Sequence, residues 1–257
     1  MNVIDAHAHF DDLEDQQAVA AVLERAAQAG VREVVAIGAT RGIGAAEQIP
    51  ALLAANPQLY GTCGVHPHDA SIFEPRVRER LAVLFASHPR ILAIGETGLD
   101  FHYDFSPRDA QRVAFRAQLA LARELDAPVV LHIREAHEEA RAILDELPPP
   151  RAVVHCFTGS VDDARAYLDR GYWLSFSGIL TFPKSEVIRE AARMAAADRV
   201  MVETDSPYLT PAPHRKIRRN EPSYVVHTLA KLAELRGLDL AEAAELTAAN
   251  TRAFFGF

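Results

Sequence analysis

Cysteine is scarce in this chain, with Cys63 and Cys156 the two thiols among 257 residues. They lie far apart in separate apolar segments, so the sequence indicates neither a disulfide framework nor a cysteine zinc site. No apolar run reaches membrane-spanning length, and the first residues lack the basic and apolar regions of a signal peptide. These absences predict a soluble protein of the reducing cytoplasm.

Basic residues are outnumbered as well: 27 Lys and Arg stand against 35 Asp and Glu, a formal net charge of −8 at pH 7. An acidic surface repels phosphate, which argues against a protein that coats nucleic acid but leaves room for a local basic patch. Hydrophobic residues make up 49% of the chain. That content supports a large core, and α/β barrels commonly have about 250 residues.

Short β-branched runs alternate with helical patterns along the whole chain. The predicted strands are residues 2–6, 31–38, 59–67, 91–96, 128–133, 152–157, 172–178 and 199–204. The predicted helices are residues 16–29, 44–55, 76–87, 107–125, 135–147, 161–170, 186–196, 224–236 and 240–247. Eight such units with apolar strands favour an α/β fold, a single (β/α)8 TIM barrel, over an open doubly wound sheet. Because no linker or repeat interrupts the pattern, residues 1–257 are predicted to form one domain.

Histidines and acids gather where the predicted strands end. His7 and His9 follow the first run at a spacing of two, which places both imidazoles on the same side of a strand. Later runs end in or near His66, Glu96, His132, His155 and Asp205. The carboxyl ends of barrel strands share one face, so we expect these side chains to converge there. Burying so many polar groups together is unfavourable without a partner, and a bound metal ion provides one.

Each of these residues also fits a structural role when it is taken alone. An isolated His-x-His pair, or one strand-end histidine such as His132, is commonly a satisfied core residue. Glu96 fits a helix-capping carboxylate, and Asp205 begins an Asp-Ser-Pro segment typical of turns. The metal interpretation depends on their shared position at the strand ends.

Seven segments between residues 5 and 226 carry a family resemblance: DAHAHF, GVHPHD, IGETGLDFHYDFSPRDAQRVAF, LHIREA, HCFTG, ETDSPYL and RRNEPSYV. In these segments and their order, the chain resembles the TatD family of metal-dependent hydrolases, the TatD-like deoxyribonucleases of the amidohydrolase-like superfamily. The resemblance implies a divalent-metal-dependent phosphodiesterase with 3′→5′ exonuclease action on DNA. It places the metal ligands on His7, His9, Glu96, His132, His155 and Asp205. Ala8 stands where the family commonly has cysteine, at a position that points away from the site.

The predicted ligands suffice for two divalent metal ions. Their imidazoles favour Zn or Mn over Mg, whereas the abundance of Mg in cells favours Mg. The expected grouping is His7, His9 and Asp205 around one ion, His132 and His155 around the other, and Glu96 as the bridge. Two divalent cations and two carboxylates leave a site charge of about +2, which suits a phosphodiester.

Asp205 and Glu96 are the predicted catalytic carboxylates. A water activated by the ions is the expected nucleophile, and Asp205 is the expected base because Glu96 bridges the ions. Glu203, two residues before Asp205, is an alternative base. It fits equally well as a buried partner of a ligand.

Two residues are predicted to contact the substrate. His66 lies at the end of the third strand outside the ligand set, and Arg134, two residues after His132, has a guanidinium suited to a phosphate. A structural role for His66 and an ion pair for Arg134 are the alternatives. Four permanent positive charges lie within residues 214–219 and favour contact with a nucleic-acid backbone over a merely solvated loop.

Aromatic residues are few near the predicted site, with Tyr208 and Tyr224 as candidates for base stacking, so little base specificity is expected. The expected partner is DNA. We expect the protein to be a monomer and not to associate with a membrane. The alternative function is a deacylase of aminoacyl-tRNA, or another ester or amide hydrolase, using the same metals. A third possibility is a barrel without catalytic activity that only binds other proteins. It does not explain why six polar side chains, which are unfavourable to bury, would be kept at one end of the barrel.

Overall fold

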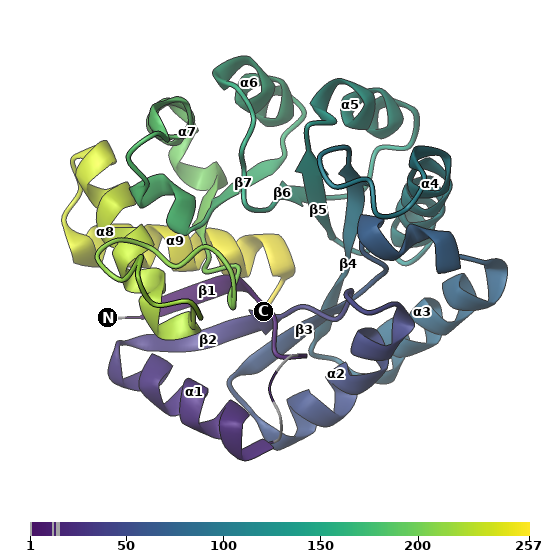
Figure 1. Ribbon diagram of the computed structural model, residues 1–257, viewed down its shortest axis with the longest axis horizontal. Helices are drawn as coiled ribbons and strands as arrows, with labels where there is room; N and C mark the ends of the chain where they lie inside the picture. Colours follow the sequence, from purple (N-terminus) through teal and green to yellow (C-terminus); the bar gives the residue numbers. More distant parts are fainter. Residues whose placement is uncertain (1, 12, 14–15) are drawn as a thin grey trace. The chain divides into compact units, whose positions relative to one another are not determined.

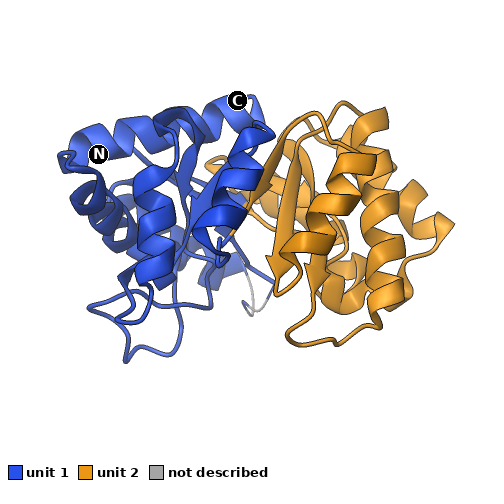
Figure 2. Ribbon diagram, turned by 90° about the horizontal axis from the view of Figure 1, so that it is seen from above, with its two compact units in different colours: residues 1–35, 156–257 blue, residues 36–155 orange. Residues whose placement is uncertain are grey.

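The computed structural model describes residues 2–11, 13 and 16–257 (Figure 1). The chain divides into two compact units, one formed by residues 1–35 with 156–257 and the other by residues 36–155 (Figure 2). Within the described ranges, each strand and helix predicted from the sequence has its counterpart. In the same ranges, no helix combines the length and apolar character needed to cross a bilayer.

The unit of residues 36–155 holds parallel strands that pair in chain order. Their Val-, Ile- and Leu-rich runs are buried, as is usual for strands of a parallel sheet. The strands are β3 (Leu59–Cys63), β4 (Ile91–Asp100), β5 (Val129–Arg134) and β6 (Ala152–Val154). The helices are α2 (Ile43–Ala55), α3 (Pro75–Ser87), α4 (Arg108–Glu124) and α5 (His137–Glu146), with a 3₁₀ helix, η1 (Pro67–Ile72).

Strand β4 corrects one predicted boundary. The sequence pattern ends this strand at Glu96, which was wrong, because the strand continues to Asp100. Gly98 makes the continuation possible: it pairs with His132 of β5, and a Cβ at Gly98 would lie 2.0 Å from the His132 carbonyl oxygen. Its φ of +149° is also one that residues with a Cβ rarely adopt. Gly98 therefore allows the two strands to approach closely, and two residues later Asp100 pairs with Arg134.

The unit of residues 1–35 and 156–257 is built in the same way. Its strands are β1 (Val3–Ala8), β2 (Val31–Ala36, the last residue of which is assigned to the other unit), β7 (Trp173–Phe176) and β8 (Val200–Val202). Its helices are α1 (Gln16–Gln28), α6 (Val161–Asp169), α7 (Glu186–Met194), α8 (Val225–Arg236) and α9 (Leu240–Phe255), with 3₁₀ helices η2 (Gly178–Thr181), η3 (Ala197–Arg199) and η4 (Pro222–Tyr224). Strands β7 and β8 pair in parallel, and Ala8 forms a parallel bridge with Ser206.

Helix α9 extends beyond its predicted end at Thr247 to Phe255. Threonine and asparagine have weak helix propensity, which is why the sequence pattern fades there. In the structure the hydroxyls of Thr247 and Thr251 donate to the carbonyls of Ala243 and Thr247, each at 2.8 Å. Burial of Phe255 against the core then outweighs the local preference.

The family segment RRNEPSYV anchors the loop that follows β8. The buried amide of Asn220 donates to the carbonyl oxygens of Thr204 at 3.0 Å and Tyr208 at 2.6 Å. Its neighbour Glu221 accepts two hydrogen bonds at one oxygen from the guanidinium of Arg25 on α1, at 2.6 and 2.9 Å. These two residues therefore fix both the course of the loop and its attachment to α1.

Replacement of Glu221 by Gln is expected to lower the free energy of unfolding by about 1–2 kcal/mol at pH 7, because the contact with Arg25 loses its charge. Burial opposes ionisation, but the hydrogen bonds from Arg25 and Ser223 outweigh it and hold the pKa of Glu221 below its ordinary value of 4.5. A carboxylate with a depressed pKa stabilises the fold above that ordinary value and loses its contribution as the pH falls through the folded-state pKa.

The free-energy difference between wild type and Glu221→Gln, measured by urea denaturation, should therefore be full at pH 7 and shrink below about pH 4.5. Glu24→Gln, on the exposed face of α1, is the matched control and should leave stability nearly unchanged. A difference that stays constant down to pH 3 would contradict this assignment.

Candidate metal-binding clusters

The unit that contains both chain termini holds the first cluster, formed by His7, His9 and Asp205. His7 lies on β1 and His9 just after it, while Asp205 follows β8 with a left-handed φ of 54°. Two backbone hydrogen bonds hold the segments together, from Asp205 N to His7 O at 3.0 Å and from His9 N to Ser206 O at 2.8 Å. The two-residue spacing places both rings on one side of the chain, as the sequence predicts.

Three donor atoms of this cluster converge. The Nε2 atoms of His7 and His9 lie 3.2 Å apart. The Oδ1 atom of Asp205 lies 3.6 Å from the first and 3.5 Å from the second. Ligands at about 2.1 Å from a tetrahedral cation lie about 3.4 Å from one another. The spacing and the donor types therefore fit a divalent metal ion.

A buried carboxylate supports this cluster from below. Asp5, two residues before His7 on β1, accepts hydrogen bonds from the backbone N–H of Thr204 at 2.8 Å and from its hydroxyl at 2.6 Å. Burial raises the pKa of Asp5 to about 8. The contact joins the two segments that carry the cluster, and sequence analysis did not identify it.

Glu203, the alternative base, is fully buried. Its Oε1 accepts a hydrogen bond from the backbone N–H of Cys156 at 2.7 Å. The side chain thus supports the chain that leaves β6, a contact that matches its alternative as a buried structural partner.

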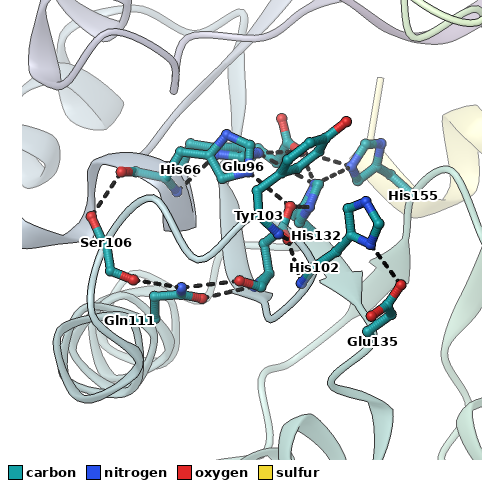
Figure 3. Close-up of polar contacts among 11 residues, drawn as sticks. His66, Glu96, His102, Tyr103, Ser106, Gln111, His132, Glu135 and His155 are labelled. Atoms are coloured by element: carbon teal, nitrogen blue, oxygen red, sulfur yellow. Dashed lines mark hydrogen bonds and ion pairs between the residues drawn. The ribbon is translucent and has the colours of Figure 1, made fainter.

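The unit of residues 36–155 holds the second cluster, centred on Glu96 of β4 (Figure 3). One oxygen of Glu96, Oε1, lies 2.8 Å from Nδ1 of His132 on β5 and 2.7 Å from Nε2 of His155, which follows β6. The two ring nitrogens are 3.2 Å apart. The predicted ligands thus form two groups of three, one in each unit, and this second group also offers a carboxylate and two imidazoles to a cation.

His66 belongs to the same cluster in space but differs in its chemistry. Its Nε2 lies 3.4 Å from Glu96 Oε1, and its Nδ1 accepts a hydrogen bond from the backbone N–H of His68 at 3.1 Å. Burial lowers the pKa of His66 to about 4, so the ring carries one proton near neutral pH. Since Nδ1 accepts, that proton lies on Nε2, which makes His66 a hydrogen-bond donor toward the cluster.

Asp100 is the site residue that sequence analysis missed. Its Oδ2 accepts hydrogen bonds from Nε2 of His132 at 3.1 Å and from Nε2 of His68 at 2.8 Å. A histidine ligand commonly donates its second N–H to a carboxylate, which fixes the ring and raises its basicity. Asp100 therefore turns Nδ1 of His132 toward Glu96. The signal in the sequence was the GLD of the GETGLD segment, which lies just beyond the predicted strand end at Glu96.

The charges in this network follow from the same contacts. Burial alone would favour the neutral acid, but the hydrogen bonds from His132 and His68 outweigh it and hold the pKa of Asp100 well below its usual range. Burial likewise lowers the pKa of His132, yet the hydrogen bonds to Asp100 and Glu96 raise it overall.

Three histidines of the same unit also come close together: one ring nitrogen from each of His66, His68 and His132 lies within 4.8 Å of the others. In that group the Nε2 atoms of His68 and His132 already donate to Asp100.

The remaining predicted contacts are spread over both units. Arg134 is half-buried, and its guanidinium carbon lies 4.6 Å above the ring of Tyr103. Residues 215–219 are exposed. Tyr224 stacks on His214 with ring centroids 4.6 Å apart, whereas the side chain of Tyr208 is 59% exposed. Of the two tyrosines considered for base stacking, Tyr208 therefore has the more accessible ring.

Comparison with known proteins shows what the whole chain is similar to. The family model described as TatD related DNase matches residues 4–256. The chain is 35% identical over 257 residues to the uncharacterized metal-dependent hydrolase YabD of Bacillus subtilis, with 98% of each chain covered. It is 40% identical over 244 residues to the 3′-5′ ssDNA/RNA exonuclease TatD of Enterobacter lignolyticus, with 92% of each covered.

Among solved structures, the chain is similar to YJJV, a TatD homolog of Escherichia coli, with a TM-score of 0.90 and 30% identity. The match covers 99% of this chain and 98% of that one. The fold is therefore a TatD-like TIM barrel, and the predicted fold class is confirmed.

Replacement of Asp100 by Asn is expected to weaken divalent-metal binding by about 10–100-fold, because His132 loses its charged hydrogen-bond acceptor. The measurement is competition of metal-free protein with a fluorescent zinc chelator. Asp104→Asn, an exposed acid on the following loop that pairs with Arg108, is the matched control and should bind zinc like wild type. Equal affinity of wild type and Asp100→Asn would contradict the positioning role.

Proposed function

This chain belongs to the TatD family of DNases, and from that premise we propose that it is a divalent-metal-dependent hydrolase that removes nucleotides from the 3′ ends of single-stranded DNA or RNA. The observation that carries the proposal is the pair of histidine and carboxylate clusters, each built from segments that also carry the family resemblance. The exonuclease TatD of Enterobacter lignolyticus is matched over 92% of this chain at 40% identity, which supports a shared reaction. We further propose that residues 1–257 act as one domain.

The proposed metal ligands are the predicted six: His7, His9 and Asp205 in one cluster, and Glu96, His132 and His155 in the other. Both clusters combine imidazoles with a carboxylate, a donor set that suits Zn or Mn. Bound divalent ions supply Lewis acidity, which lowers the pKa of an attacking water and stabilises the charge that develops on the phosphodiester. The bridging role of Glu96 stays a prediction, as do the metal's identity and the number of ions.

The chain's own groups have distinct proposed roles in the reaction. Asp205 is the proposed base, and its side chain is 14% exposed, so water reaches it. Glu203 suits this role less because it is buried and its Oε1 accepts from Cys156 N. His66 donates its Nε2 hydrogen to a phosphate oxygen, and Arg134 neutralises a neighbouring phosphate through its guanidinium.

The nucleic acid is proposed to bind mainly through its backbone. The exposed cations of residues 215–219 offer such contacts on a chain with a formal net charge of −8. The cytoplasmic location and the monomeric state remain predictions from the sequence.

The central test uses a 5′-labelled single-stranded DNA with Zn²⁺, Mn²⁺ or Mg²⁺, and resolves the products by length. We expect stepwise shortening from the 3′ end, abolished by EDTA and restored by added metal. Asp205→Ala should lower kcat by about 10²–10⁴-fold, since it removes the base and a ligand. Asp198→Ala, an exposed acid paired with Arg199, is the control and should cleave normally. Undiminished cleavage by Asp205→Ala would refute the proposed roles.

The alternative function, ester hydrolysis on aminoacyl-tRNA, uses the same clusters and is decided by substrate preference. Under identical metal conditions, kcat/KM for release of nucleotides from single-stranded DNA should exceed that for deacylation of charged tRNA by at least about tenfold. The reverse order would replace the exonuclease proposal with the deacylase one.

A further inference from the structure

Two exposed aromatic rings lie on the loop that follows β4. Tyr103 and Phe105 stack on each other with centroids 5.2 Å apart and planes inclined by 20°. Their side chains remain 47% and 69% exposed. Single exposed apolar residues are ordinary, but two stacked rings presented together to solvent form a patch that binds other flat groups well.

The loop is held in place by a buried hydrogen-bond network, shown in Figure 3. Asp100 Oδ1 accepts from the backbone N–H groups of His102 at 3.0 Å and Tyr103 at 2.9 Å. The amide of Gln111 on α4 donates to the carbonyls of Ser106 at 2.9 Å and Asp100 at 3.1 Å.

The other end of the loop is fastened to η1. The hydroxyl of Ser106 donates to His68 O at 2.7 Å and accepts from Ser71 N at 3.1 Å. The loop is therefore anchored at both ends, and the rings stay exposed because their backbone is fixed. A preorganised aromatic surface of this kind binds a partner with little loss of conformational entropy.

The aromatic pair lies beside the second cluster of the same unit. The ring of His68 contacts both members, with centroids 5.5 Å from Tyr103 and 4.7 Å from Phe105. Through Asp100, His68 is linked to His132, a proposed metal ligand. A group stacked on the pair would thus lie one side chain away from the residues proposed to carry the reaction.

Positive charge accompanies the rings. The guanidinium carbon of Arg134 lies 4.6 Å from the centroid of Tyr103. An aromatic surface next to a guanidinium complements a nucleotide, whose flat base stacks while its phosphate accepts hydrogen bonds. Asp104 lies between the two aromatic residues in the sequence, and its carboxylate is paired with Arg108, whose guanidinium carbon lies 4.2 Å from the centroid of Phe101. Arg134 is the cation that lies over the ring of Tyr103.

We propose that Tyr103 and Phe105 form a stacking subsite for an unpaired nucleobase at the 3′ end of the substrate. This inference rests on the proposed function and names the part of the substrate that the site holds. Every base has a π-face, so the subsite binds all four bases with small differences. A base paired within a duplex is not available to it, which favours single-stranded ends.

The test compares two single-stranded oligonucleotides that differ only at the 3′ terminus, where one carries a base and the other an abasic tetrahydrofuran residue. Wild type should show a kcat/KM at least about tenfold higher for the base-bearing end, the effect expected of one stacked base. The double variant Tyr103→Ala/Phe105→Ala should lose this preference by reduced activity on the base-bearing end, with activity on the abasic end unchanged.

Two controls separate stacking from other effects. Tyr103→Phe keeps the ring and should retain the preference, while Val113→Ala removes an exposed apolar side chain from α4, where Val113 is 62% exposed, and should behave like wild type. If the double variant loses activity equally on both oligonucleotides, or retains the preference, the subsite is rejected.

A binding measurement distinguishes failure of the subsite from failure of the proposed function. In EDTA, where no cleavage is expected, fluorescence anisotropy of 5′-labelled oligonucleotides should give a Kd about tenfold lower for the base-bearing end in wild type and equal values in the double variant. Equal binding of both ends by wild type rejects the subsite even if cleavage occurs. Preferential binding without cleavage of either end retains the subsite and rejects the exonuclease activity.

Discussion

The buried carboxylate of Asp100 is the contact on which the unit of residues 36–155 depends. One oxygen accepts from His68 and His132, and the other accepts from the backbone of His102 and Tyr103. Removing a carboxylate from water is unfavourable, but several donors offset that loss and keep the group ionised. One side chain thus orients a proposed metal ligand and shapes the neighbouring loop, so the position of the cluster and the position of the rings are coupled.

The unit with both chain termini also has a buried acid beside its cluster, but there burial outweighs the hydrogen bonds and raises the pKa of Asp5 to about 8. Asp5 is buried on β1 and binds both the backbone and the hydroxyl of Thr204, next to Asp205. In each unit, a buried carboxyl group next to the donor atoms joins two segments of the chain. Such a support keeps donor atoms at fixed separations before any cation arrives, which reduces the reorganisation that binding requires.

An acidic chain that acts on an acidic polymer must overcome its own charge near the site. We assign this task to bound cations, to the guanidinium of Arg134 in one unit and to the exposed cations of residues 215–219 in the other. The chain as a whole keeps its excess of Asp and Glu. Stacking adds an attraction that does not depend on charge. The combination suits a substrate whose ends are single-stranded and whose sequence varies.

The amino-acid sequence by itself determined the order of strands and helices, because apolar periodicity is a local pattern, and the family, because seven motif segments carry the resemblance. The ligand set that this resemblance implies stays a prediction. Only the tertiary structure decided where β4 ends, since its continuation to Asp100 depends on pairing with β5 and on the space at Gly98. The roles of Asp100 and the aromatic pair followed from that continuation. The end of α9 was also decided by packing, because burial of Phe255 outweighs weak helix propensity. Contacts between residues distant in the chain leave no periodic signal, so spacing alone does not reveal them.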